Sequence, residues 1–143
     1  LTSNISEDAP KIFGNLAFLS ESFRADPTQN ITPLSLEDLE VFQTLEEITG
    51  YIYIDSWPEE LANLSVFESL HVIRGRLLHN GAYSLVVRNL SISSLGLRSL
   101  KEISSGLVLL EANPNLCYLD SIPWTKIFRS PRQAILKTTN KPQ

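Results

Sequence analysis

The strongest constraint on the fold is a segment of large apolar residues ending in glycine that occurs three times. The copies occupy residues 42–50, 67–75 and 97–106. Each copy has large apolar residues at its first, fourth and seventh positions, and a short apolar stretch follows its glycine. The spacing between the first two copies falls within the about 20–29 residues that are typical of leucine-rich repeats. A single copy cannot bury its own apolar face, so the pattern predicts coils that stack on one another.

An amphipathic helix is the alternative interpretation of apolar residues three positions apart. The glycine that closes each copy favours a turn instead, because glycine enters tight turns with little steric cost. The stretches after the glycines, residues 51–54, 76–78 and 107–110, are predicted to be short strands. The sequence therefore predicts a mainly β solenoid of stacked coils.

The remaining segments extend this pattern in both directions. Residues 11–19 repeat the second half of the unit, a glycine followed by an apolar stretch, and are predicted to form an incomplete first coil. Further strands are predicted at residues 83–88, directly after a turn at 113–117, and at 134–136. Asn80-Gly81, just before the first of these strands, is a strong turn signal. A loop is expected over residues 23–33.

Short helices are expected at the ends and corners of the stack. Ser35 can accept a hydrogen bond from the first turn of a helix, and acidic residues in that turn suit its positive end. Leu36, Leu39 and Phe42 would form the apolar face of this helix. It would then cover an end or an edge of the stack.

Two prolines are expected to open further helical segments. Residues 58–64 are predicted to form a short helical turn and residues 123–128 a closing helix, each beginning at its proline. Trp57 is expected in the core, with its indole nitrogen bound to a carbonyl group.

Length and composition indicate one globular domain. At 143 residues the chain is long enough for one substantial core. We expect a flexible lead-in at residues 1–10, a single domain at 11–137 and a polar tail at 138–143. The composition, with 43% hydrophobic and 20% charged residues, is ordinary for a soluble globular protein. In isolation the domain is expected to be a monomer.

Charge and hydropathy argue against two classes of partner. The net charge of −4, without runs of Lys and Arg interleaved with aromatic residues, argues against nucleic-acid binding. Uninterrupted apolar stretches are only a few residues long, so no membrane span is expected in this chain.

Cysteine usage and glycosylation patterns point to different compartments. Cys117 is the only cysteine, which excludes an internal disulfide and a zinc site built on several thiolates. Four Asn-x-Ser/Thr acceptor patterns favour a secreted origin instead. They begin at Asn4, Asn30, Asn63 and Asn89. In a secreted chain, Cys117 would be half of a bridge to a cysteine outside this sequence, or a free thiol.

No catalytic, metal or cofactor site is predicted. His71 and His79 have no cysteine or patterned carboxylates near them in the sequence, as a metal site or a catalytic triad would need. Some β-helix proteins process polysaccharides, which keeps one enzymatic alternative open. Such an enzyme needs carboxylates that converge in a groove. Asp55 and Glu111 follow strands of different coils, and the sequence does not show that they meet.

Longer motifs carry a family resemblance. They are LEEITGYIYI at 45–54, VIRGR at 72–76, NGAYS at 80–84, SLGLRSLKEI at 94–103 and NLCY at 115–118. With these motifs at consistent spacing, the chain resembles the second leucine-rich L domain, extracellular domain III, of the epidermal growth factor receptor family. KIFG at 11–14 and LLHNGAYS at 77–84 follow the variant of its neu-type branch. The resemblance covers nearly everything from residue 11 to residue 142.

The resemblance implies a right-handed β-helix, a leucine-rich L-domain solenoid with short capping helices, in the extracellular part of a cell-surface receptor tyrosine kinase. The kinase lies elsewhere in such a receptor, so this chain is expected not to be an enzyme. In ligand-binding relatives the domain supplies one of two surfaces that grip a growth factor. The neu-type branch binds no known growth factor directly and pairs with its relatives. The implied function is a non-catalytic protein-binding module for a growth factor, a sister receptor or an antibody, with no cofactor.

The same resemblance implies candidate partner-binding positions. They are Ala17, Asp26, Tyr53, Asp55, Asn80 and Tyr83. Tyr53 and Tyr83 would be aromatic anchors, and Asp26 would pair with a basic residue of a partner. The alternative is structural, with the tyrosines covering apolar stems and Asp26 in a turn. Ala17 and Asn80 do not retain the side chains of ligand-binding relatives, which favours that alternative.

Departures from the family pattern suggest a second interpretation of the whole chain. Ala9-Pro10 stands where the family usually has a cysteine, and the partner of the cysteine that matches Cys117 normally lies just past the last residue. Many positions expected on the surface also differ from the family. The alternative to a natural receptor domain is a redesigned scaffold or antigen derived from it, without a natural ligand.

Overall fold

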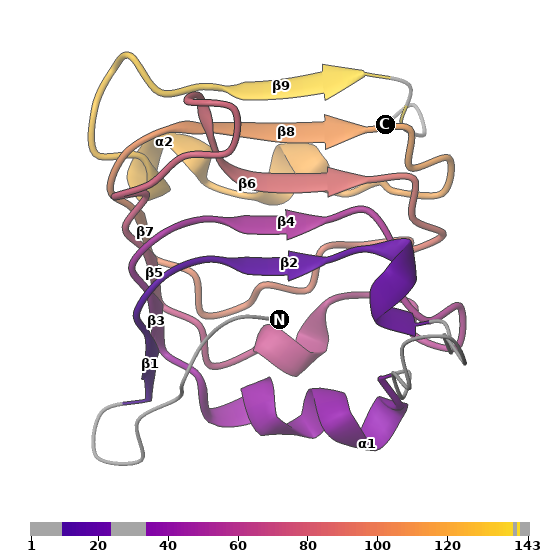
Figure 1. The fold of residues 1–143 in the computed structure, drawn as a ribbon. Coiled ribbons are helices and arrows are strands. Elements are labelled where there is room, and N and C mark those ends of the chain that lie inside the picture. Colours follow the sequence, from indigo (N-terminus) through magenta and orange to yellow (C-terminus); the bar gives the residue numbers. More distant parts are fainter. Residues whose placement is uncertain (1–9, 24–33, 139, 141–143) are drawn as a thin grey trace.

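The computed structural model of the chain describes residues 10–23, 34–138 and 140. Its strands form two sheets in which neighbouring strands are parallel (Figure 1). The four-stranded sheet has the order β1 (Lys11–Ile12), β3 (Glu47–Ile48), β5 (Val72–Ile73) and β7 (Glu102–Ile103). The five-stranded sheet has the order β2 (Leu16–Phe18), β4 (Ile52–Ile54), β6 (Tyr83–Arg88), β8 (Leu107–Glu111) and β9 (Ile135–Thr138). The protein is therefore mainly β, as predicted.

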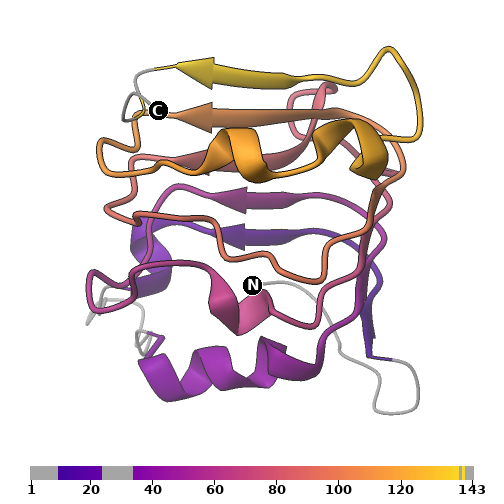
Figure 2. The same cartoon turned by 180° about the vertical axis from the view of Figure 1, so that it is seen from behind.

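Short helical segments complete the fold. They are η1 (Ser20–Phe23), α1 (Leu36–Leu39), η2 (Glu40–Thr44), η3 (Ser65–Phe67), η4 (Leu119–Ser121) and α2 (Trp124–Ile127). Seen from behind in Figure 2, the side opposite the five-stranded sheet consists of irregular segments and the short helices, among them α2. Among the described residues, no helix has the length and apolar character needed to cross a bilayer.

Each repeat contributes two strands per coil, one on each side of its glycine. The seventh position of the repeat, Ile48, Ile73 or Ile103, lies in a two-residue strand before the glycine, and these three residues are aligned in register. The sequence pattern predicted a strand only after the glycine and missed β3, β5 and β7. From β1 to β8, successive strands consequently alternate between the two sheets, and β9 then adds to the five-stranded sheet beside β8.

The apolar positions of the repeat share one core, as predicted. Leu45 and Leu70 are fully buried and Leu100 is 8% exposed, and all three belong to the same hydrophobic cluster. Full burial of a side chain of this size contributes about 1.5–3 kcal/mol. Phe18 packs edge-on against Phe42, Trp57 and Phe67 at the N-terminal end of the stack.

The aromatic cluster also confirms the expected role of Trp57. Its indole Nε1 donates a hydrogen bond to the carbonyl oxygen of Asn63 at 3.1 Å, and the side chain is buried. The indole thus buries its ring without leaving a polar atom unsatisfied.

The helix predicted to begin at Ser35 is present as α1. The hydroxyl of Ser35 accepts a hydrogen bond from the Asp38 amide, and the Asp38 carboxylate accepts one from the Ser35 amide. This reciprocal capping box stabilises the first turn. Leu39 and Phe42 are buried as expected, but Leu36 is 44% exposed, so its expected place on the apolar face was wrong.

Three other local predictions were wrong. Residues 76–78 form a loop and not a strand, and the strand of that coil begins at Tyr83. Residues 58–64 form turns without a helix, because the helical turn starts only at Ser65. The segment after Cys117 enters η4 and not a strand.

Most of the remaining expectations were met where the structure describes the chain, but Phe23, expected in a loop, belongs to η1. The incomplete first coil is present as β1 and β2, the closing helix as α2 and the last strand as β9. Asn80 and Gly81 both have positive φ, 52° and 69°, as a tight turn between close strands requires. Residues 1–9 of the expected lead-in and residues 24–33 of the expected loop lie outside the described residues.

Candidate protein-binding face

The outer side of the five-stranded sheet presents one row of apolar side chains. Strand register aligns one residue from each strand across the sheet: Ala17, Tyr53, Val86, Leu109 and Leu136. Side chains alternate between the two sides of a strand, and the flanking residues Leu85 and Val87 belong to the core. Hence this row, hereafter the outer row, points away from the core, although Val86 in its middle is only 1% exposed. Leu136 is 40% exposed at one edge.

Charged and polar groups border the outer row at the carboxyl ends of the strands. Arg88 of β6 is aligned with Glu111 of β8, and its Nη2 lies 3.4 Å from the Glu111 Oε2. On β4 the Tyr53 hydroxyl donates a hydrogen bond to the Asp55 Oδ2 at 3.2 Å. Burial raises the pKa of Tyr53, and the negative charge of Asp55 raises it further. At neutral pH Tyr53 is therefore a neutral hydrogen-bonding group.

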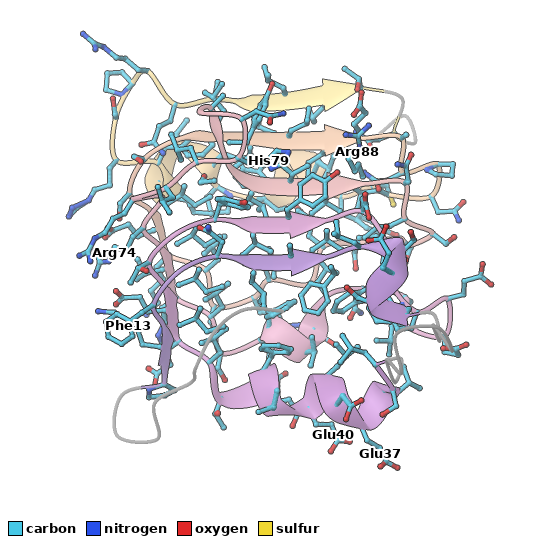
Figure 3. The ribbon with its side chains drawn as sticks, viewed as in Figure 1. Phe13, Glu37, Glu40, Arg74, His79 and Arg88 are labelled. Atoms are coloured by element: carbon cyan, nitrogen blue, oxygen red, sulfur yellow. The ribbon has the colours of Figure 1, made fainter. Side chains whose placement is uncertain are left out.

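The loop of residues 76–82 reaches over the same face. His79 packs against Tyr53 with ring centroids 4.3 Å apart, and meets Tyr51 edge-on at 5.6 Å. A backbone bridge between His79 and Tyr83 closes the loop. Figure 3 shows His79 and Arg88 over the five-stranded sheet, whereas Phe13 and Arg74 lie at the side of the four-stranded sheet.

The residues that the resemblance singled out gather on this face where they are described. Ala17 and Tyr53 belong to the outer row, Asp55 directly follows β4, and Tyr83 begins β6. Asn80 is exposed in the loop that His79 anchors on Tyr53. Asp26 lies outside the described residues. The structure thus places five of the six positions on one side of the sheet or on the loop above it.

Sequence reasoning missed four members of the face. They are His79, Val86, Leu109 and Leu136. A signal existed for Leu109, because it stands three residues after its repeat glycine, as do Ala17 and Tyr53. Val86 does not follow this spacing. The loop after Gly75 and the register shift between Tyr83 and Leu85 change the number of residues between the repeat glycine and the outer row in β6.

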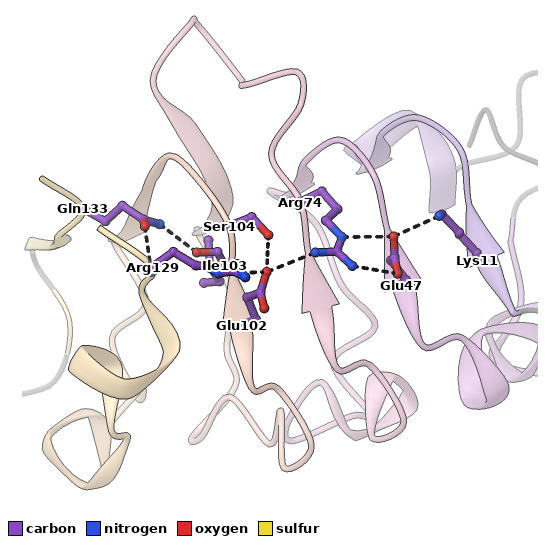
Figure 4. Close-up of polar contacts among 8 residues, drawn as sticks. All are labelled: Lys11, Glu47, Arg74, Glu102, Ile103, Ser104, Arg129 and Gln133. Atoms are coloured by element: carbon purple, nitrogen blue, oxygen red, sulfur yellow. Dashed lines mark hydrogen bonds and ion pairs between the residues drawn. The ribbon is translucent and has the colours of Figure 1, made fainter. Parts of the chain in front are cut away.

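The outer side of the four-stranded sheet is occupied by a ladder of ion pairs (Figure 4). Its members alternate in charge: Lys11, Glu47, Arg74, Glu102 and Arg129. Arg74 is central, because its Nε lies 3.1 Å from Glu47 and its Nη1 lies 3.1 Å from Glu102. The hydrogen bond from Arg74 is the main cause that lowers the pKa of Glu47 below 4.5. Each of the two carboxylates, Glu47 and Glu102, is thus paired with two cations within the ladder.

The two glycosylation candidates that the structure describes, and the cysteine, are not members of the outer row. Asn89 is exposed just after β6, and Asn63 is half-buried before η3, whereas Asn4 and Asn30 lie outside the described residues. Cys117 is a free, half-buried thiol whose Sγ lies 3.5 Å from the Ser93 carbonyl oxygen.

The carboxylates considered for an enzymatic alternative are engaged separately. Asp55 accepts a hydrogen bond from Tyr53, and Glu111 pairs with Arg88. His71 pairs with Glu46 at 3.5 Å. Within the described part of the chain, no group of three or more His, Cys, Asp and Glu residues is arranged to hold a metal ion.

Comparison with known proteins gives a consistent match for this arrangement. Residues 10–128 match the family described as Receptor L domain. The chain is 57% identical over 133 residues to receptor tyrosine-protein kinase erbB-2 of Rattus norvegicus, covering 93% of this chain and 11% of the relative. It is 55% identical over 144 residues to the Mus musculus erbB-2, covering 99% of this chain and 12% of the relative.

A more distant relative matches over the same region. The chain is 42% identical over 137 residues to the epidermal growth factor receptor of Gallus gallus, covering 94% of this chain and 20% of that protein. The chain thus spans between 11% and 20% of the length of these relatives.

Proposed function

The chain belongs to the receptor L domain family, and from this premise we propose that it is a non-catalytic protein-binding module of a growth-factor receptor ectodomain. Its partner is a growth factor, a sister receptor of the same family or an antibody. The outer row carries this proposal. It combines aligned apolar side chains with a border of hydrogen-bonding and charged groups on a rigid sheet.

The physical character of the outer face supports protein recognition. Interfaces typically place apolar and aromatic residues at the centre and polar residues at the rim. Tyr53 offers a large ring with a neutral hydroxyl, and Leu109 extends the apolar surface beside it. Arg88 and Glu111 supply charge of both signs at the border. Parallel strands hydrogen-bonded from coil to coil hold these groups in fixed positions, so binding requires little ordering of the backbone.

The overall fold is inferred to be a right-handed β-helix, a leucine-rich L-domain solenoid. Two observations support it: the strands from β1 to β8 alternate between two sheets along the chain, and strands of neighbouring repeats pair in parallel. Crossover connections between parallel strands of one sheet are right-handed in about 98% of cases.

Localisation follows from the family. The matched relatives are receptors, and the match covers their L domain, so the chain is placed in the extracellular part of a cell-surface receptor. The kinase activity that their names describe belongs to another part of those much longer proteins. The single domain is inferred to span residues 11–137.

The test measures binding of the whole chain to immobilised family growth factors and sister-receptor ectodomains. If the outer row is the binding face, Leu109→Glu and Tyr53→Ala weaken binding by about tenfold or more, the effect expected of central interface residues. Phe13→Ser is the matched control. Phe13 is 68% exposed and follows a strand of the other sheet, so its loss leaves the affinity unchanged.

Two outcomes contradict the proposal. Equal weakening by Phe13→Ser and Leu109→Glu would move the binding site away from the outer row. Absence of binding to every family growth factor and sister receptor, with the folded state confirmed by circular dichroism, would favour a redesigned scaffold or antigen without a natural ligand.

A further inference from the structure

Two of the four glycosylation acceptor patterns lie in described segments, and their surroundings differ sharply. Asn89-Leu90-Ser91 follows β6 at the carboxyl end of the five-stranded sheet. Asn63-Leu64-Ser65 enters η3 on the side of the molecule away from that sheet. The sequence pattern alone does not distinguish them, because both satisfy the Asn-x-Ser/Thr rule.

The surroundings of Asn89 suit a large attached group. Asn89 is exposed and has a φ of 61°, a left-handed conformation that asparagine adopts more readily than most residues. Its backbone amide is bonded to the Glu111 carbonyl oxygen at 3.1 Å, which fixes the turn. Ser91, the third residue of the pattern, is also exposed. The backbone thus holds Asn89 in an exposed turn at the end of β6.

The surroundings of Asn63 are restrictive. Its Oδ1 accepts a hydrogen bond from the Ser65 amide at 2.9 Å, and its carbonyl oxygen accepts the Trp57 indole bond. The side chain also packs against Gly96 of the next coil, where an added Cβ would lie 3.2 Å from the Asn63 Cβ and 3.3 Å from its Cγ. The Asn63 amide is thus held by the Ser65 amide and lies against the neighbouring Gly96, so a sugar on its Nδ2 would have to fit beside Gly96.

We propose that Asn89 carries an N-linked glycan in the folded, secreted protein and that Asn63 does not. The donor is a polyprenyl-diphosphate-linked oligosaccharide. The Asn89 Nδ2 forms a bond to C1 of the first sugar, the bond from C1 to the phosphate oxygen breaks, and the polyprenyl diphosphate leaves. The amide nitrogen gives up one proton to a base, so atoms and charge balance. The inference rests on the proposed extracellular function only in requiring passage through the secretory pathway.

A glycan at Asn89 has a consequence for the proposed binding face. Asn89 directly follows Arg88, so the sugar would stand beyond the charged border formed by Arg88 and Glu111. It would leave the apolar outer row uncovered and restrict the approach of a partner from the carboxyl ends of the strands. The glycan would therefore block a large partner from approaching the outer row from the carboxyl ends of the strands.

The experiment uses the full chain, secreted from an animal-cell host behind an added signal peptide and purified as the folded monomer. Enzymatic deglycosylation in heavy-oxygen water converts each occupied asparagine into a labelled aspartate, which peptide mass spectrometry reads site by site. We expect several-fold higher occupancy at Asn89 than at Asn63. Asn89→Gln and Ser91→Ala should each lower the mass of the intact protein by one glycan. The matched Asn63→Gln variant should carry the same number of glycans as the parent chain.

The proposal is overturned if folded, secreted protein carries an unmodified Asn89, or if Asn63 is occupied to the same extent. Partner binding is not used as a readout. Failure of the glycan proposal and failure of the proposed protein-binding function are therefore distinguishable.

Discussion

The imidazole of His79 lies against the phenol ring of Tyr53, with ring centroids 4.3 Å apart and ring planes inclined by 32°. The contact joins the loop of residues 76–82 to the centre of the candidate binding face. Since burial is the largest cause of the raised pKa of Tyr53, the loop contributes directly to the chemical character of that residue.

Replacing His79 with alanine should lower the pKa of Tyr53 toward its ordinary value of 10.0, because the ring becomes more exposed. Loss of the ring contact should also reduce the free energy of unfolding by about 1 kcal/mol. Ultraviolet titration of the phenols, compared with a Tyr53→Phe variant to assign the Tyr53 signal, measures the first effect. His71→Ala is the matched control, because His71 pairs with Glu46 and not with a tyrosine. An unchanged Tyr53 titration in His79→Ala would contradict the prediction.

The raised pKa of Tyr53 also predicts how the free energy of unfolding changes with pH. A pKa raised in the folded state means that the neutral phenol is favoured by folding. The corresponding stability is present below pH 10 and is lost as the pH rises through the folded pKa. Chemical unfolding between neutral and strongly alkaline pH should therefore show a smaller alkaline loss of stability in His79→Ala than in the parent chain.

Arg74→Met should destabilise the four-stranded sheet more than Lys11→Met. Arg74 separates two carboxylates, Glu47 and Glu102, which its loss leaves without their central cation. We expect Arg74→Met to lower the free energy of unfolding by about 1.5–3 kcal/mol, as for hydrogen bonds to charged groups. Lys11 pairs only with Glu47 within the ladder, at its end, so its replacement should cost about 0.5 kcal/mol. Urea unfolding at low and high salt measures both, and equal losses would show that the central position of Arg74 is unimportant.

The same ladder predicts an acid response. The pKa of Glu47 is lowered from 4.5, chiefly by the hydrogen bond from Arg74. The paired carboxylate therefore stabilises the fold above pH 4.5, and this stability is lost as the pH falls through the lower folded pKa. Arg74→Met should flatten the dependence of unfolding free energy on pH in that acidic range. A curve parallel to that of the parent chain would refute the assignment.

Much of the core was predictable because the repeated apolar positions are themselves the core positions. Every large apolar residue at the fourth and seventh positions, from Leu45 to Ile103, is buried in one cluster. The helix start at Ser35 and the turn at Asn80 were also predictable, since each depends on a few adjacent residues, although the reciprocal bond from Asp38 was not predicted. At these positions the local sequence preference and the burial in the folded protein favour the same structure.

The short strands before the glycines were not predictable from their own residues. Two-residue segments such as Glu47–Ile48 are too short to show an alternating pattern, and their ladder bonds come from neighbouring coils. The candidate face was only partly readable for the same reason. Its outer row depends on the register of five strands. In β6 that register shifts between Tyr83 and Leu85, and no feature of the sequence predicts this shift.

Gly75→Ala should be far more destabilising than Gly81→Ala. Both glycines have nearly the same left-handed backbone, with φ of 65° and 69°. An added Cβ at Gly75 would lie 2.7 Å from the Ser105 carbonyl oxygen of the next coil, whereas nothing lies within 4 Å at Gly81. We expect Gly81→Ala to lower the free energy of unfolding by about 1–2 kcal/mol, the cost of placing alanine in a left-handed conformation. A clearly larger loss at Gly75 in thermal unfolding would measure the close approach of two coils, and equal losses would contradict it.

Asn113→Ala should be among the most destabilising single changes, because one buried amide satisfies two backbone groups at the carboxyl end of β6. The Asn113 side chain is fully buried, its Oδ1 accepts from the Leu90 amide at 2.9 Å, and its Nδ2 donates to the Val87 carbonyl oxygen at 3.0 Å. Alanine leaves both backbone groups unpaired in the interior, at a cost of about 1–3 kcal/mol each. Asn115→Ala is the matched control, since that exposed amide donates only to the Ser91 carbonyl oxygen at 3.3 Å. If urea unfolding gives similar free energies for the two variants, the buried amide is not what holds the carboxyl end of β6 against the following coil.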